Sequence, residues 1–135
     1  MIAFLDACAI IYRIEAVEPY VMKLKRAFDN LERRHPRAAI AVSRLSTLEC
    51  RVLPLRNRDV ETLMLYDQFF NAVDLRIVEI SAEVMDRATV IRADSRLAIP
   101  DALQAACALS LPGELIFFTN DAKFRAVEGL KLALL

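Results

Sequence analysis

The sequence predicts an α/β protein of three α/β/α layers, with helices on both faces of a parallel sheet of about five strands. Short apolar runs alternate with helical segments along the whole chain. These runs are mainly continuous rather than alternating in apolar character, which is typical of parallel strands that are buried on both faces. The chain has 2 glycines in 135 residues and is 56% hydrophobic, which favours a compact, helix-rich fold over a β-sandwich or a disordered chain.

The first strand and the first two helices are predicted from apolar runs and helical spacing. Residues 2–5 form a continuous apolar run, and residues 7–14 then read as a helix. A second helix starts at Glu18–Pro19, because apolar residues recur at i, i+3, i+7 and i+10 from Val21. It ends in the segment ERRHPR, because the residue before Pro36 is disfavoured in a helix.

The middle of the chain repeats the same alternation. Residues 38–43 are a second apolar strand, and residues 46–53 resemble a short helix that Pro54 closes. Residues 58–72 have helical spacing, and residues 75–80 are a third strand. Strand and helix therefore keep alternating without a repeat or a linker.

The last third of the chain holds two further strands. Residues 82–93 are helical, and Pro100 opens the next helix, which runs to Leu111, because proline is favoured in a first helical turn. Residues 114–119 are a fourth strand, 122–126 a short helix, and 130–135 a closing strand.

Composition excludes several classes of protein. Lys plus Arg and Asp plus Glu both number 18, so the chain lacks the positive balance of a protein that coats nucleic acid non-specifically. Cys8, Cys50 and Cys107 are widely spaced and suit neither a disulfide framework nor a zinc knuckle. No signal peptide is visible, and the uncharged stretch 102–113 is too short to span a bilayer. We therefore expect a single cytoplasmic domain, residues 1–135, that does not enter a membrane.

Four carboxylates occupy positions that would meet at one edge of such a sheet. Asp6 ends the first strand, and Asp121 lies just past the fourth. Glu49 lies on the helix that leaves the second strand, and Asp101 lies in the first turn of its own helix. Ligands of open parallel sheets bind at the carboxyl ends of the strands. A divalent cation would relieve the mutual repulsion, and an oxygen-rich set with almost no histidine selects Mg²⁺ or Mn²⁺ over Zn²⁺.

Each of these acids also has a structural interpretation. Glu49 could be the last residue of a capping box of the form S-x-x-E, and Asp101 could be stabilised by the helix dipole alone. Asp121 or Asn120 could cap the helix that follows. Asp6 is the hardest to explain in this way, because apolar residues precede and follow it.

The carboxylates point to phosphate-ester chemistry. A Mg²⁺–carboxylate cluster can activate water and stabilise a leaving oxygen. The chain has no glycine-rich phosphate loop, so a P-loop nucleotide site is not expected. Its one histidine, His35, lies in a predicted turn, which argues against Ser-His or Cys-His catalysis.

Five segments carry a resemblance to a known family. They are FLDACAIIY, SRLSTLEC, IPDALQAACAL, FFTNDAKF and the final GLKLALL. In order, spacing and total length, the sequence resembles the PIN-domain ribonucleases, and in particular the VapC-like toxins of type II (VapBC) toxin–antitoxin modules. The resemblance covers nearly the whole chain.

The resemblance implies a site, a reaction and partners. Asp6, Asp101 and Asp121 would ligate Mg²⁺ or Mn²⁺, and Glu49 would ligate or act as a base. Thr119 and Asn120 would be the neighbours that orient these acids. Family members hydrolyse RNA, are inhibited by a VapB-like antitoxin and commonly form homodimers. Candidates for phosphate contacts are four arginines, for which ordinary surface or antitoxin salt bridges are the alternative: Arg13, Arg44, Arg51 and Arg96.

Two departures from the family pattern keep other functions open. Ala7 and Cys8 stand where the family usually has a hydroxyl or amide residue, and Gln104 stands where many members have histidine. A PIN-like module with weakened catalysis that binds RNA or an antitoxin is therefore the alternative hypothesis. A phosphatase with Asp6 as nucleophile is a further one, but its general acid would fall at Cys8, which suits that role poorly.

One helix has more apolar surface than a single core stripe needs. Core packing is the default interpretation, and a groove for a partner helix or a dimer seam is the alternative. The residues in question are Leu63, Met64, Leu65, Phe69 and Phe70.

Overall fold

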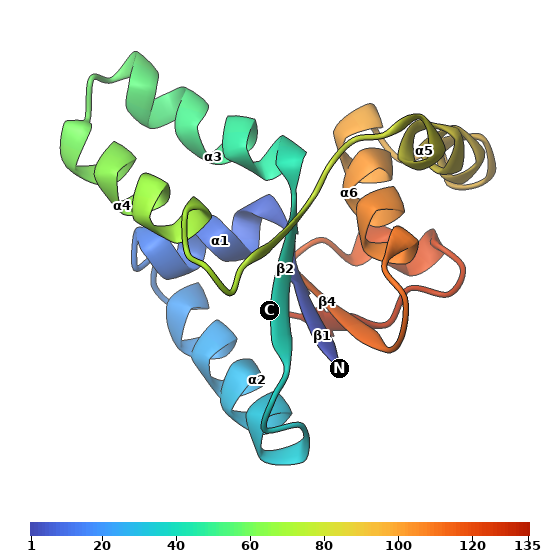
Figure 1. The fold of residues 1–135 in the computed structure, drawn as a ribbon, viewed down its shortest axis with the longest axis horizontal. Coiled ribbons are helices and arrows are strands. Elements are labelled where there is room, and N and C mark those ends of the chain that lie inside the picture. Colours follow the sequence, from blue (N-terminus) through green and yellow to red (C-terminus); the bar gives the residue numbers. More distant parts are fainter.

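The computed structural model describes all residues, 1–135, as a five-stranded sheet between helices (Figure 1). The strands are β1 (Ile2–Leu5), β2 (Ala39–Ser43), β3 (Arg76–Val78), β4 (Leu115–Thr119) and β5 (Leu132–Leu134). The helices are α1 (Ala7–Ile14), α2 (Tyr20–Arg34), α3 (Arg44–Arg56), α4 (Val60–Phe70), α5 (Ala82–Ser95), α6 (Ile99–Ser110) and the 3₁₀ helix η1 (Ala122–Ala126). The predicted α/β fold class is confirmed, and α1 and η1 have the predicted bounds.

All the strands are parallel, in the order β3-β2-β1-β4-β5. Figure 1 shows the sheet nearly edge-on, with α1 to α4 on one side and α5 and α6 on the other. The central strand β1 pairs with both β2 and β4, so Ile2 lies opposite Ala39 on one side and Leu115 on the other. The predicted three-layer arrangement is therefore confirmed.

The core lies on both faces of the sheet, because alternate residues of the central strands point to opposite faces. On the α5–α6 face, Phe4 stacks on Phe117 with ring centroids 5.5 Å apart, and Phe124 of η1 packs on Phe117. On the other face, Phe118 stacks on Phe28 of α2 at 4.8 Å. This two-sided burial explains why these strands are apolar without alternation.

Helices α3 and α4 differ from their predicted bounds by two or three residues at both ends, more than the other helices do. Helix α3 begins at Arg44 rather than at Ser46, because the Ser43 hydroxyl accepts a hydrogen bond from the Leu45 N–H at 3.0 Å and caps the helix. It also continues through Pro54, which lies near its end, where the lost N–H removes a single helical bond.

Helix α4 begins at Val60 rather than at Arg58. The backbone of Arg58 is left-handed, with φ of 53°, which a helix does not accommodate. The Asp59 side chain then caps the helix by accepting from the Thr62 N–H at 3.1 Å.

None of the protein's helices combines the length and the apolar character that crossing a bilayer requires.

Candidate active site

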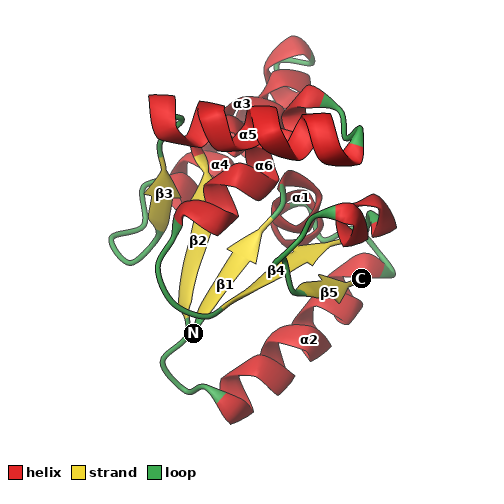
Figure 2. Ribbon diagram, turned by 90° about the vertical axis from the view of Figure 1, so that its right-hand side faces the viewer, coloured by secondary structure: helices red, strands yellow, loops and turns green.

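The four predicted acids lie at or beyond the carboxyl ends of the three central strands, and we call them the acidic set (Asp6, Glu49, Asp101 and Asp121). Figure 2 shows β1 between β2 and β4, with the three arrows pointing toward the same edge. Asp6 follows β1 directly, and Asp121 is the second residue after β4. Glu49 lies in α3, which follows β2, and Asp101 lies in the first turn of α6.

Asp6 is buried at 8% exposure, and both of its carboxylate oxygens have partners. Oδ1 accepts from the Ala7 N–H at 2.8 Å, which makes Asp6 the N-cap of α1. Oδ2 accepts from the Thr119 hydroxyl at 2.8 Å and from the Cys8 thiol at 3.6 Å. Burial raises the pKa of Asp6 to about 6, the hydrogen bonds oppose this shift, and the charge of Glu49 adds to it. The helix cap and the hydroxyl thus compensate part of the cost of burying this acid.

Thr119 and Asn120 lie between Asp6 and Asp121 at the end of β4. The fully buried Thr119 hydroxyl donates to Asp6 and accepts from the Asp121 N–H at 3.1 Å, so it links the ends of β1 and β4. Asn120 is exposed, and its side-chain amide donates to the Tyr12 hydroxyl rather than to an acid. Thr119 therefore contacts the acidic set directly, whereas Asn120 contacts an aromatic residue beside it.

Asp121 and Asp101 keep the structural roles that their positions in the sequence allow. Asp121 caps η1, because its Oδ1 accepts from the Lys123 N–H at 2.9 Å. Asp101 lies in the first turn of α6. Burial raises the pKa of Asp101, the charge of Asp121 raises it further, and Lys123 lowers it. These two carboxylates therefore repel each other across the gap between η1 and α6.

Glu49 is held by Gln104, which sequence analysis named only as a departure from the family pattern and did not assign to the site. The Gln104 side chain is 1% exposed, and its Nε2 donates to Glu49 Oε1 at 3.1 Å and to the Ser46 hydroxyl at 2.9 Å. Burial raises the pKa of Glu49, the bond from Gln104 lowers it, and the charge of Asp101 raises it. The Gln104 Oε1 atom is buried without a partner. Two signals in the sequence pointed to Gln104: a single amide among the apolar residues of DALQAACAL, and its place where many family members have histidine.

The capping-box interpretation of Glu49 is wrong. The N-cap of α3 is Ser43, so Glu49 lies in the interior of the helix and its carboxylate reaches across to α6. The bond from Gln104 to Glu49 thus joins α6 to α3 beside the acidic set.

The acidic set suits a hard cation in its chemistry but does not form a complete metal site as it stands. Each acid is repelled by the next: the charge of Glu49 raises the pKa of Asp6, that of Asp101 raises the pKa of Glu49, and that of Asp121 raises the pKa of Asp101. All the donors are carboxylate oxygens. No group of three or more His, Cys, Asp or Glu side chains lies close enough together to hold an ion. The carboxylates would have to turn toward an ion in order to share it.

Comparison with known proteins identifies the family. The family model of the PIN domain matches residues 3–130. The chain belongs to the PIN domain family. A search of curated proteins found no match.

The fold of this PIN domain is also seen in solved structures of low sequence identity. VapBC2 from Rickettsia felis, bound to a promoter DNA fragment, matches with a TM-score of 0.75 at 21% identity, over 99% of this chain and 98% of that one. A toxin–antitoxin complex from Klebsiella pneumoniae matches with 0.64 at 23% identity, over 95% and 94%. VapC20 from Mycobacterium tuberculosis, a toxin that cleaves the sarcin–ricin loop, matches with 0.68 at 16% identity, over 92% and 93%.

Two of the four candidate arginines of this PIN domain have partners within the chain. The Arg44 Nε lies 3.1 and 3.0 Å from the two carboxylate oxygens of Glu79. The Arg51 Nε donates to the Thr47 carbonyl at 2.6 Å, and its Nη1 lies 3.7 Å from Asp67. These pairs are exposed, so they can exchange partners at small cost.

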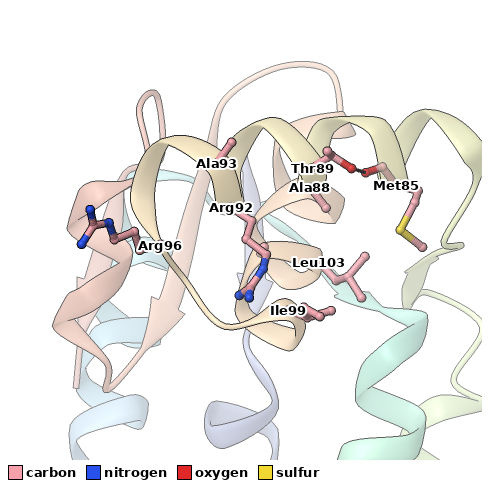
Figure 3. Close-up of a pocket in the computed structure, with 9 residues that line it drawn as sticks. Met85, Ala88, Thr89, Arg92, Ala93, Arg96, Ile99 and Leu103 are labelled. Atoms are coloured by element: carbon pink, nitrogen blue, oxygen red, sulfur yellow. Dashed lines mark hydrogen bonds between the residues drawn. The ribbon is translucent and has the colours of Figure 1, made fainter.

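The other two arginines lie in different surroundings. Arg13 lies over the ring of Phe28, with 5.9 Å from its guanidinium carbon to the ring centroid. Arg96 borders a hollow of about 580 Å³ between α5 and α6 (Figure 3). On α6, the hollow is lined by residues at the spacing of one helix face, such as Ile99 and Leu103, whereas Asp101 and Gln104 lie on the other side of the helix. The hollow is thus separate from the acidic set.

Proposed function

We propose that this PIN domain is a metal-dependent endoribonuclease that hydrolyses RNA phosphodiester bonds and acts as the toxin of a toxin–antitoxin pair. The observation that carries the proposal is the acidic set itself. Two of its carboxylates follow separate strands and two lie on separate helices. Each of Asp6, Glu49 and Asp101 has a pKa raised by burial and by a neighbouring acid. Membership of the PIN family and the likeness to the toxins named above support the same reaction.

The proposed metal would be held by Asp6, Asp101 and Asp121. When bound, Mg²⁺ or Mn²⁺ lowers the pKa of a water molecule and stabilises the oxygen that leaves the phosphate. Thr119 fixes the orientation of Asp6, because its hydroxyl donates to Oδ2. The cap of η1 occupies only Oδ1 of Asp121 and leaves its second oxygen without a partner.

Glu49 is the proposed proton acceptor. Gln104 holds Oε1 of this carboxylate, so Oε2 remains to take a proton from the attacking water. A half-buried carboxylate with a raised pKa is a stronger base than an exposed one, which suits this role. The scissile phosphate would then lie between Glu49 and the three other acids.

The test is RNA cleavage with matched variants. Asp6→Asn keeps a side chain that can cap α1 but removes the charge, so we expect it to abolish Mg²⁺-dependent cleavage and leave the fold intact. Asp59→Asn is the control, because Asp59 also caps a helix but lies at α4 and outside the acidic set. Undiminished cleavage by the Asp6→Asn protein would refute the assignment.

An antitoxin and a second copy of the chain are the proposed partners. Met64 and Leu65 of α4 are exposed, at 58% and 46%, so the core-packing interpretation is wrong for these two residues. Leu63, Phe69 and Phe70 are partly buried. Further exposed apolar residues lie on α3, which packs beside α4, and we treat the two sets as one surface: Leu48, Val52, Leu53 and Leu55. We assign this surface to an antitoxin of the VapB kind, because an apolar area of this extent favours burial against a partner.

Oligomeric state and compartment are proposed from the exposed apolar residues and the free thiols. The exposed apolar residues of α3 and α4 could also be buried against a second copy of the chain, as a homodimer. Light scattering of the purified chain tests this. The three cysteines are all free thiols, which suits the reducing cytoplasm.

A second candidate function is a PIN-like module that binds RNA or an antitoxin without cleaving. Ala7 and Cys8, which stand where the family usually has a hydroxyl or amide residue beside the metal, are the features that favour it. Calorimetric titration with Mn²⁺ separates the two candidates, because a module without a working site should bind the ion weakly or not at all.

A further inference from the structure

Tyr12 of α1 and Tyr20 of α2 form an aromatic pair of unusual placement in this protein. Their rings are nearly parallel, with an interplanar angle of 12° and centroids 4.3 Å apart. Both residues are partly exposed. In every other near-parallel pair, at least one ring is buried in the core, as for Phe4 with Phe117. Core packing therefore does not account for this pair in the way that it accounts for the others.

The pair lies beside the acidic set. Tyr12 follows Cys8 by four residues on α1, which places it one turn, or about 6 Å, farther along the helix on the same face. The Cys8 thiol contacts Asp6, as described above. The Tyr12 hydroxyl accepts from the side chain of Asn120, which precedes Asp121. The aromatic pair therefore lies near the end of β1, through Cys8, and near the end of β4, through Asn120.

A cation without an acidic partner accompanies the rings. The Lys23 ammonium lies over the Tyr20 ring, 5.4 Å from its centroid, and takes part in no salt bridge, so a base that stacks on Tyr20 takes its place over the ring. Its neighbour Lys25, also on α2, is instead paired with Asp29 at 3.0 Å. Partly exposed aromatic rings next to a cation without an acidic partner are the combination that binds unpaired nucleotides, because bases stack on the rings and phosphates attract the cation.

We propose that the Tyr12–Tyr20 pair is a stacking platform for one unpaired RNA base next to the scissile phosphate, with Lys23 contacting the adjoining phosphate. This inference rests on the proposed function, since it names the kind of RNA that the same site accepts. A base must leave its helix in order to stack on a side chain, so the platform selects single-stranded or looped RNA over duplex RNA. Stacking tolerates any base, so the platform itself imposes little sequence preference.

The test measures RNA binding in EDTA, so that cleavage plays no part. The probes are a fluorescent single strand, its duplex with the complement, and the same strand with abasic residues. Tyr20→Leu should weaken binding of the single strand by about tenfold, which corresponds to the loss of one stacked base. Tyr20→Phe keeps the ring and should retain wild-type affinity. The abasic strand should bind the wild-type protein about as weakly and should lose nothing further with Tyr20→Leu.

Lys23 provides a second, independent test of the proposal. Lys23→Gln should weaken binding and reduce the salt dependence of the affinity by about one phosphate contact. Lys25→Gln is the matched control on the same helix, because Lys25 already has an acidic partner, and it should change binding less.

Several results would overturn the platform. Equal losses for the Phe and Leu variants, an equal effect on duplex RNA, or full affinity for the abasic strand would each do so. The abasic comparison uses wild-type protein, so it decides the matter even if Tyr20→Leu does not fold. Cleavage in Mg²⁺ with unchanged binding by Tyr20→Leu would refute the platform and leave the nuclease standing. If the variants bind RNA as expected but the wild-type protein does not cleave it, the platform stands and the nuclease is refuted.

Discussion

Replacing Asp6 with asparagine should make the metal-free protein more stable at neutral pH. Burial raises the pKa of Asp6 from 3.8 to about 6, so the folded state binds the proton more tightly than the unfolded state does. The free energy of unfolding therefore falls as pH rises through this window. Each pKa unit corresponds to ~1.4 kcal/mol, so a shift of about two units lowers the free energy of unfolding by at most about 3 kcal/mol above pH 6.

The asparagine side chain stays neutral and can still cap α1, so this pH dependence should disappear in the variant. The assay is urea unfolding in EDTA at pH values between 4 and 8, followed by circular dichroism. The difference between the two proteins isolates Asp6 from the other titrating groups. Wild-type protein should be the less stable of the two at pH 7 and should lose that disadvantage near pH 4. A constant difference across the range, or a variant that is less stable at pH 7, would show that the charge of Asp6 is not a burden in the folded state.

Three further substitutions probe contacts around the site. Thr119→Val removes the hydroxyl that donates to Asp6, so unfolding should become easier by about 1–2 kcal/mol in urea titrations, and Mn²⁺ should bind more weakly. Gln104→Leu removes the donor to Glu49, so kcat should fall by about tenfold while KM for RNA stays the same, and the pH–rate profile should move upward because the pKa of Glu49 rises. Glu79→Gln frees Arg44, so RNA should bind more tightly at low salt, and equal affinity at all salt concentrations would exclude a phosphate contact by Arg44.

The sequence predicted what local patterns encode. Continuous apolar runs located the strands, and Asp6 and Asp121 were expected at the ends of β1 and β4 because the chemistry of the chain changes there from apolar to acidic. Both acids proved to be helix caps as well, since a cap uses one carboxylate oxygen and leaves the other. The structural and chemical interpretations of these two positions are therefore compatible.

The contacts that sequence analysis missed join distant residues. Gln104 and Glu49 are 55 positions apart, Asn120 and Tyr12 are 108 apart, and both bonds depend on how helices pack around the finished sheet. No local period encodes such pairs. The start of α3 was missed for a smaller reason, because Ser43 and Ser46 are both good caps and only the end of β2 decides between them.

The central claim is that Asp6, Asp101 and Asp121 act together as a cation site beside Glu49. Isothermal titration of Mn²⁺ at pH 7 into the wild-type protein, Asp6→Asn and the Asp59→Asn control tests it most directly. The acidic set predicts saturable binding to the wild-type and control proteins and a large loss of affinity in Asp6→Asn. Equal binding to all three proteins, or no binding to the wild-type protein, would contradict it.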